Sequence, residues 1–319
     1  MALITNLILF IISCIALVLS GSWLVKSLSK IASFLKISEF VAGFIIMAMA
    51  TTLPELSVGI TSALAKNTAL ALGTVIGSNI ANLTIIIGIP ILLARGITIH
   101  SPRTKTDALY MVFISIVPLT LMLMGRQLNR IDGIVLIAVF LIYARRMYVH
   151  GRIFKKEYAE NNIKRITIFL TTLLFIVSMV VLFFAAKFVV QYATALSTDL
   201  ALPPILIGLF LIAIGTSLPE LIFGSQAVLK GHSEMMLGNI MGANIANLTL
   251  VLGITAIIYP ITSDFLLFIT SGIYMLIITF IFATFVESGS RLYIKEGISL
   301  ILLYIFFIII ELSLRGIVV

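Results

Sequence analysis

Charged residues are scarce in this chain of 319 residues. Asp, Glu, Lys and Arg make up 11% of it, whereas hydrophobic residues make up 61% and the mean hydropathy is +1.22. So few polar side chains leave little material for a water-soluble domain, which excludes a soluble enzyme and a nucleic-acid-binding protein. The composition indicates an integral membrane protein whose main partner is the lipid bilayer. The net charge of +8 is expected to reflect membrane topology.

Cysteine and histidine are scarce as well. Cys14 is the single cysteine, so no intrachain disulfide can form. The three histidines fall in loops predicted to face the cytoplasm, and neither a Cys/His metal motif nor a phosphate-binding P-loop occurs. We therefore expect no cofactor, no enzymatic activity and no ATP-driven pumping.

Long apolar runs predict an all-α integral membrane protein with ten transmembrane helices. The runs cover residues 4–25, 37–65, 69–94, 107–125, 132–147, 166–190, 202–229, 235–260, 264–286 and 297–314. The first run is interpreted as a retained helix, because it lacks a basic start and a small-residue cleavage site. A basic hydrophilic linker, 148–165, separates the first five helices (1–147) from the second five (166–319). Lys and Arg gather on the same side as this linker, which places it in the cytoplasm and both termini outside.

The chain contains one internal repeat. Residues 43–88 and 208–253 align without a gap at a constant offset of 165, and 19 of 46 positions are identical. Five predicted helices separate equivalent points, so the two copies must cross the membrane in opposite directions. Such inverted repeats are typical of secondary transporters, whose binding site lies between the repeats near the middle of the membrane.

Each copy of the repeat carries a carboxylate and a proline deep in an apolar run. Glu55 lies in the phrase ATTLPEL and Glu220 in GTSLPEL. A charged side chain at the centre of a bilayer costs at least about 2.5–3.5 kcal/mol, so a bound cation is expected to offset the pair. Pro54 and Pro219 each remove a backbone N–H and predict a break in the helix next to the carboxylate.

Oxygen-bearing side chains surround these breaks in the sequence. Thr51 and Thr216 lie four residues before the glutamates, on the same helix face. The second part of each copy reads GTVIGSNIANL and GNIMGANIANL, which places Ser78 and Asn82 four residues apart and aligns Asn82 with Asn247. A site built from carboxylate, amide, hydroxyl and carbonyl oxygens suits a hard cation, and its two formal charges favour Ca²⁺ over Mg²⁺.

Each of these features also has a purely structural interpretation. The glutamates could be hydrogen-bonding residues of the helix bundle, and Asn82 and Asn247 could bond across helices. Thr84 and Thr249 are expected to bond their own helix backbone. Glu311 precedes Arg315 by four residues and is interpreted as half of a surface ion pair.

The paired phrases TTLPE/GTSLPE and GSNIAN/GANIAN in two inverted halves resemble the α-repeats of the sodium/calcium exchanger branch of the cation/calcium antiporter superfamily, especially its compact prokaryotic members. The resemblance implies a monomeric antiporter in a prokaryotic cell membrane. It places cation sites between the second, third, seventh and eighth helices, and it implies that the first and sixth helices slide across this core.

The resemblance also implies a role for each matching position. Ca²⁺ would be held by Glu55, Glu220 and the backbone carbonyls of Thr51 and Thr216. The positions implied for Na⁺ or another counter-ion are Ala48, Ala213, Thr52, Ser217, Ser78, Asn82 and Asn247, with the two asparagines around the middle site.

Three points keep the counter-ion open. Ala243 stands where the family pattern has a serine opposite Ser78, and Asn247 is neutral where some relatives carry Asp, which weakens the case for K⁺ co-transport. A buried carboxyl also takes up a proton more readily, so a Ca²⁺/H⁺ antiporter would use the same glutamates. A passive cation channel is a further alternative, which the broken inverted repeats disfavour.

Overall fold

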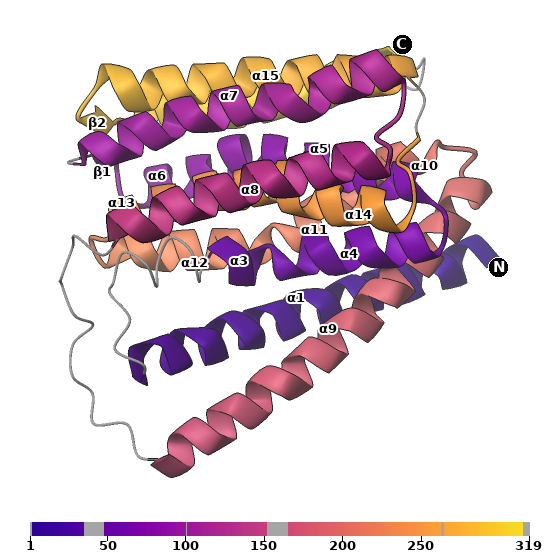
Figure 1. The fold of residues 1–319 in the computed structure, drawn as a ribbon, viewed down its shortest axis with the longest axis horizontal. Helices are drawn as coiled ribbons and strands as arrows, with labels where there is room; N and C mark the ends of the chain where they lie inside the picture. Colours follow the sequence, from indigo (N-terminus) through magenta and orange to yellow (C-terminus); the bar gives the residue numbers. More distant parts are fainter. Residues whose placement is uncertain (1, 35–47, 100, 152–164, 263–264, 315–319) are drawn as a thin grey trace.

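The computed structural model describes residues 2–34, 48–99, 101–151, 165–262 and 265–314. Helices dominate it (Figure 1). The first half contains α1 (Ala2–Phe34), α3 (Ala48–Thr51), α4 (Leu53–Leu64), α5 (Thr68–Ala81), η2 (Asn82–Ile86), α6 (Ile87–Leu93), β1 (Ile97–Thr98), α7 (Pro102–Gly125) and α8 (Arg130–Gly151). The second half contains α9 (Arg165–Asp199), α10 (Pro204–Ile207), η3 (Gly208–Ile212), α11 (Ala213–Thr216), α12 (Leu218–Leu229), α13 (Ser233–Ala246), η4 (Asn247–Val251), α14 (Leu252–Ile258), α15 (Phe265–Ser288), β2 (Arg291–Leu292) and α16 (Ile294–Ser313).

Eight helical stretches of the described chain are long and apolar enough to cross a membrane. They agree with eight of the ten expected spans. Of the other two, the expected span 132–147 lies within helix α8, which is not among these eight stretches, and part of the span 37–65 lies outside the described residues. The protein is therefore a mostly helical, multi-pass membrane protein.

The internal repeat is visible in the boundaries of the elements. α3, α4, α5, η2 and α6 correspond one by one to α11, α12, α13, η4 and α14, each pair offset by 165 residues. The expected helix breaks occur at Thr52 and Ser217, where α3 gives way to α4 and α11 to α12. Pro54 and Pro219 lie at the start of the new helical segments, where a missing N–H costs least.

The two halves also interlock through the last helix of each repeat. α6 packs against α16, and α14 packs against α8, so each half contributes a helix to the other. Strand β1 pairs antiparallel with β2, with Ile97 opposite Leu292, and an isolated bridge joins Leu128 to Ile261. These contacts close the bundle around α5 and α13.

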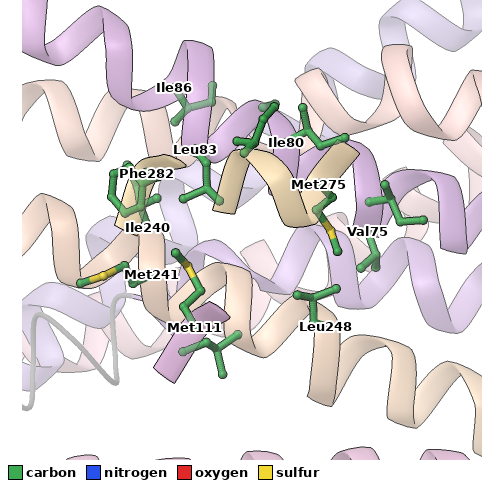
Figure 2. Packing of buried hydrophobic residues seen from close by; sticks show 14 of the residues in the cluster. Val75, Ile80, Leu83, Ile86, Met111, Ile240, Met241, Leu248, Met275 and Phe282 are labelled. Carbon is green, nitrogen blue, oxygen red and sulfur yellow. The ribbon is translucent and has the colours of Figure 1, made fainter. Parts of the chain in front are cut away.

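The hydrophobic core lies around these two central helices. Figure 2 shows side chains of α5, α7, α13 and α15 packed together, with Met111, Met275 and Phe282 among them. α5 approaches the second half closely, because a Cβ atom on Gly73 would lie 2.1 Å from the carbonyl oxygen of Ile205, and one on Gly77 equally close to that of Leu209. Glycine permits this close backbone contact because it has no side chain.

α1 and α9 form a separate layer on one face of the bundle (Figure 1). They pack against each other and against the broken helices of both repeats. Only 22% of each span is buried, compared with 83% for the spans that contain α5 and α13. Most residues of this outer pair are therefore exposed on the surface of the bundle.

Candidate cation-binding site

Glu55 and Glu220 occupy equivalent, buried positions in the two copies of the repeat. Each lies in the first turn of a helix that restarts after the break, α4 and α12, where unpaired N–H groups and the helix dipole favour a negative charge. Both side chains are buried, and none of their four carboxylate oxygens has a hydrogen-bond partner among the described residues. The two carboxylates are also close enough to repel each other electrostatically. Two adjacent buried charges without partners are unstable by themselves.

Four asparagines join the two repeats through hydrogen bonds. Nδ2 of Asn82 donates to Oδ1 of Asn244 at 2.9 Å, and Nδ2 of Asn247 donates to Oδ1 of Asn79 at 3.2 Å. Asn79 and Asn244 also donate to each other's backbone carbonyl, at 3.4 and 3.3 Å. The Oδ1 atoms of Asn82 and Asn247 are buried and have no hydrogen-bond partner among the residues that the structure describes.

A change of helix type occurs at the same asparagines. The π-helical segments η2 and η4 begin at Asn82 and Asn247, directly after α5 and α13. A π-helical turn interrupts the regular ladder of backbone hydrogen bonds and is often found at functional sites. The repeat therefore places an amide oxygen and a backbone irregularity together in both copies.

Hydroxyl groups gather on the first carbonyls of the broken helices. The carbonyl oxygen of Ala213 accepts from Thr216 Oγ1 at 3.2 Å and from Ser78 Oγ at 3.4 Å. The carbonyl oxygen of Ala48 accepts from Thr51 Oγ1 at 3.3 Å and from Thr52 Oγ1 at 2.7 Å. Two clusters of oxygens thus flank the pair of glutamates.

The hydroxyls also lie close to the carboxylates. Ser78 and Thr216 lie near Glu55, and Thr51 lies near Glu220, although none of them bonds a carboxylate oxygen. Ser217, the counterpart of Thr52, has a buried Oγ without a partner. The structure therefore brings the side chains expected at the site into one buried region: Glu55, Glu220, Thr51, Thr52, Thr216, Ser217, Ser78, Asn82 and Asn247.

The chemistry of this region is that of oxygen alone. Among the described residues, no group of three or more His, Cys, Asp and Glu side chains could hold a metal ion. Sites for zinc, copper or iron draw mainly on His nitrogen and Cys sulfur, whereas neutral and charged oxygens suit Na⁺ and Ca²⁺. The arrangement can bind hard cations and compensate their charge with two carboxylates.

Comparison with known proteins gives the family. The family model described as sodium/calcium exchanger protein matches residues 5–149 and 170–312. The chain belongs to this family. The expected family is confirmed. Its members are transporters rather than enzymes, and the function of this chain is cation transport across a membrane.

Several relatives cover most of this family member. The inner membrane protein YrbG of Escherichia coli (strain K12) is 32% identical over 86% of this chain and 86% of its own length. The sodium/calcium exchanger MaX1 of Methanosarcina acetivorans is 27% identical over 96% of this chain and 98% of its own. The solved structure of the sodium-calcium exchanger NCX_Mj soaked with 10 mM Na⁺ and zero Ca²⁺ is 26% identical, with a TM-score of 0.68, and covers 96% of this chain and 98% of that one.

Two expectations about other side chains had opposite outcomes. Thr84 and Thr249 donate to carbonyls of their own helices, as expected. The interpretation of Glu311 as a surface residue is wrong, because its side chain is buried and accepts a hydrogen bond from Ser271 Oγ at 2.9 Å. Helix α16 turns this face toward α15, which the spacing to Arg315 did not reveal.

Three asparagines in this region were not predicted from the sequence. Asn79 and Asn244 stand inside the quoted phrases GSNIAN and GANIAN, and their recurrence in both copies was the signal that could have identified them. Asn239 contacts Thr51, with 3.3 Å between Oδ1 and Oγ1. Its counterpart in the first copy is Thr74, so the comparison of the two copies gave no reason to expect it.

Proposed function

We propose that this family member is a secondary antiporter that exchanges Ca²⁺ for Na⁺ across the cell membrane. The observation that carries the proposal is the buried pair of Glu55 and Glu220, whose four oxygens lack partners among the described residues. Two uncompensated carboxylates at bilayer depth would cost about 5–7 kcal/mol even on a lenient scale. Bound cations supply the missing positive charge.

Ca²⁺ is proposed to bind between the two glutamates. Six or more oxygen ligands suit this ion, and the two carboxylates bring two negative charges. The unpartnered Oδ1 atoms of Asn82 and Asn247 and the backbone carbonyls of Thr51 and Thr216 are the further ligands proposed around the centre. Each repeat contributes one carboxylate, one amide oxygen and one backbone carbonyl, so the negative charge of the site is shared equally between the repeats.

Na⁺ is proposed to bind on the two flanks. One flank comprises the Ala213 carbonyl, Thr216 and Ser78, and the other comprises the Ala48 carbonyl, Thr51 and Thr52. Because Na⁺ and Ca²⁺ then compete for the same two carboxylates, binding of one favours release of the other. This competition is the proposed basis of obligatory exchange.

Alternating access is proposed to arise from sliding of α1 and α9. Gly21 of α1 packs against the prolines that follow both helix breaks. A Cβ atom at Gly21 would lie 3.2 Å from Pro54 Cγ and 3.5 Å from Pro219 Cγ. The face of α1 that packs inward carries Ser13, Ser20 and Ser27. Their hydroxyls donate to carbonyls of α1 itself, so these bonds do not tie α1 to the neighbouring helices. Two bare carboxylates would oppose passage of this apolar layer, and bound cations would permit it.

The proposed arrangement in the membrane follows from the repeats. Ten spans form two inverted halves, 1–147 and 166–319, joined by the cytoplasmic linker 148–165, with both termini outside. The one-to-one correspondence of α3–α6 with α11–α14 supports this arrangement. A single copy of the chain contains both glutamates, so the monomer is proposed to be the functional unit.

The test is uptake of ⁴⁵Ca²⁺ into proteoliposomes that contain the purified protein. Uptake is driven in turn by an outward gradient of Na⁺, K⁺ or H⁺, and only the Na⁺ gradient is expected to drive it. Uptake driven by the H⁺ gradient alone would replace the proposal with Ca²⁺/H⁺ exchange at the same glutamates. Flux independent of every counter-ion gradient would indicate a channel.

A further inference from the structure

The two flanks of the cation site are built from different side chains. On one flank, Ser78 Oγ lies 3.2 Å from Thr216 Oγ1 and bonds the Ala213 carbonyl. The offset of 165 residues places Ala243 at the equivalent position on the other flank, and alanine has no hydroxyl. The oxygen that completes the first flank is therefore absent at the matching position of the second.

Asn239 occupies this second flank instead. It lies four residues before Ala243 on α13, so the two share a helix face. Its side chain is completely buried and reaches Thr51, with 3.3 Å between Oδ1 and Oγ1. Its counterpart Thr74 donates to Leu70 O of its own helix at 2.9 Å and makes no such contact.

The orientation of the Asn239 amide determines which of its atoms is left over. As drawn, the single proton of the Thr51 hydroxyl faces two acceptors, Ala48 O and Asn239 Oδ1, while the buried Nδ2 has no partner in the described part of the chain. Turning the amide by 180° lets Thr51 donate to Ala48 O and accept from Nδ2, which satisfies both groups. The atom without a partner is then the amide oxygen, which a cation can bind.

We infer that Asn239 is a further cation-binding residue, whose amide oxygen takes on the Thr51 flank the place that the Ser78 hydroxyl holds on the Thr216 flank. This inference rests on the proposed function and names the ligands of one of its Na⁺ sites. An uncharged amide oxygen is a suitable ligand for Na⁺, and it leaves the charge of the site unchanged. The two flanks thus hold the same ion with different chemistry.

The experiment measures Ca²⁺ binding to the purified full chain by calorimetry, with Na⁺ as competitor. In N239A the Na⁺ concentration that halves Ca²⁺ affinity should rise about tenfold, since a lost bond to a charged partner costs about 1.5–3 kcal/mol. T74A is the matched control and should behave as the wild type. The double variant N239A/A243S restores a hydroxyl on the same face and should recover most of the Na⁺ competition.

A second variant, N239D, keeps the inference testable if N239A folds poorly. N239D keeps an oxygen at the same place and should bind Na⁺ at least as tightly as the wild type. A tenfold loss in N239D, or Na⁺ competition in N239A equal to that of the wild type, would overturn the role of Asn239 while the proposed function stands. Failure of Na⁺ to compete in the wild type itself would refute the proposed function, and this inference with it.

Discussion

The two copies of the repeat place their glutamates at the same position but differ in the positions of several hydroxyl and amide side chains. Both copies end a short helix at a threonine, restart it with proline and glutamate, and begin a π-helical segment at an asparagine. They differ at Ser78 and Ala243, at Thr74 and Asn239, and at Thr52 and Ser217. Under the proposed function, this pseudo-symmetric scaffold would hold one symmetric divalent site between two unequal monovalent sites.

The largest effect is expected from removing the shared charge. Glu55→Gln or Glu220→Gln should reduce Ca²⁺ uptake into proteoliposomes at least about 100-fold, because removing one partner of a buried charge pair in a binding site costs about 2–5 kcal/mol of binding free energy. The variants should still fold, since each removes one member of a repelling pair. Size-exclusion elution and thermal unfolding serve as controls. Near-normal uptake by either variant would contradict a shared site.

A large effect is also expected from blocking the contact between the outer pair and the helix breaks. Gly21→Leu should strongly reduce Ca²⁺ uptake while leaving calorimetric Ca²⁺ affinity within about threefold of wild type, since uptake but not affinity depends on α1 passing Pro54 and Pro219. Equal loss of binding and uptake would show that α1 belongs to the binding site itself. Leu is already common on this helix, which makes insertion in the membrane unproblematic.

An intermediate effect is expected from making the flanks alike. Ser78→Ala gives the first copy the residue that the second has at Ala243, without an asparagine one turn earlier. Na⁺ competition should weaken about tenfold, because the hydroxyl near Thr216 and Glu55 is lost. Ca²⁺ affinity measured without Na⁺ should change less. A change confined to Ca²⁺ would reverse the assignment of the flanks.

The smallest effect is expected at the position where the copies differ without consequence. Gly215→Ala gives the second copy the residue that the first has at Ala50, and a Cβ atom at Gly215 would meet nothing within 4 Å. Uptake and thermal stability should remain those of the wild type. Gly77→Ala is the contrasting variant, since its Cβ atom would lie 2.1 Å from the Leu209 carbonyl oxygen and should lower the unfolding temperature. Equal effects of the two variants would contradict the close packing of α5.

Much of the site could be predicted because its residues recur. Glu55 and Glu220 are conspicuous as charges in apolar runs, and the offset of 165 residues identifies Thr51, Asn82 and their counterparts. Eight of the ten expected helices follow from apolar length alone. Glu311 was misassigned, because a spacing of four residues indicates a shared helix face but not whether that face meets solvent or another helix.

The membrane class, the repeat, the helix breaks and the two buried carboxylates follow from the amino-acid sequence alone. These properties depend on composition and local spacing, which are readable along the chain. The tertiary structure decided the amide network of Asn79 and Asn244 and the approach of Asn239 to Thr51. These contacts join residues more than 150 positions apart, and the packing of α5 and α13 between the halves determines them rather than any local pattern.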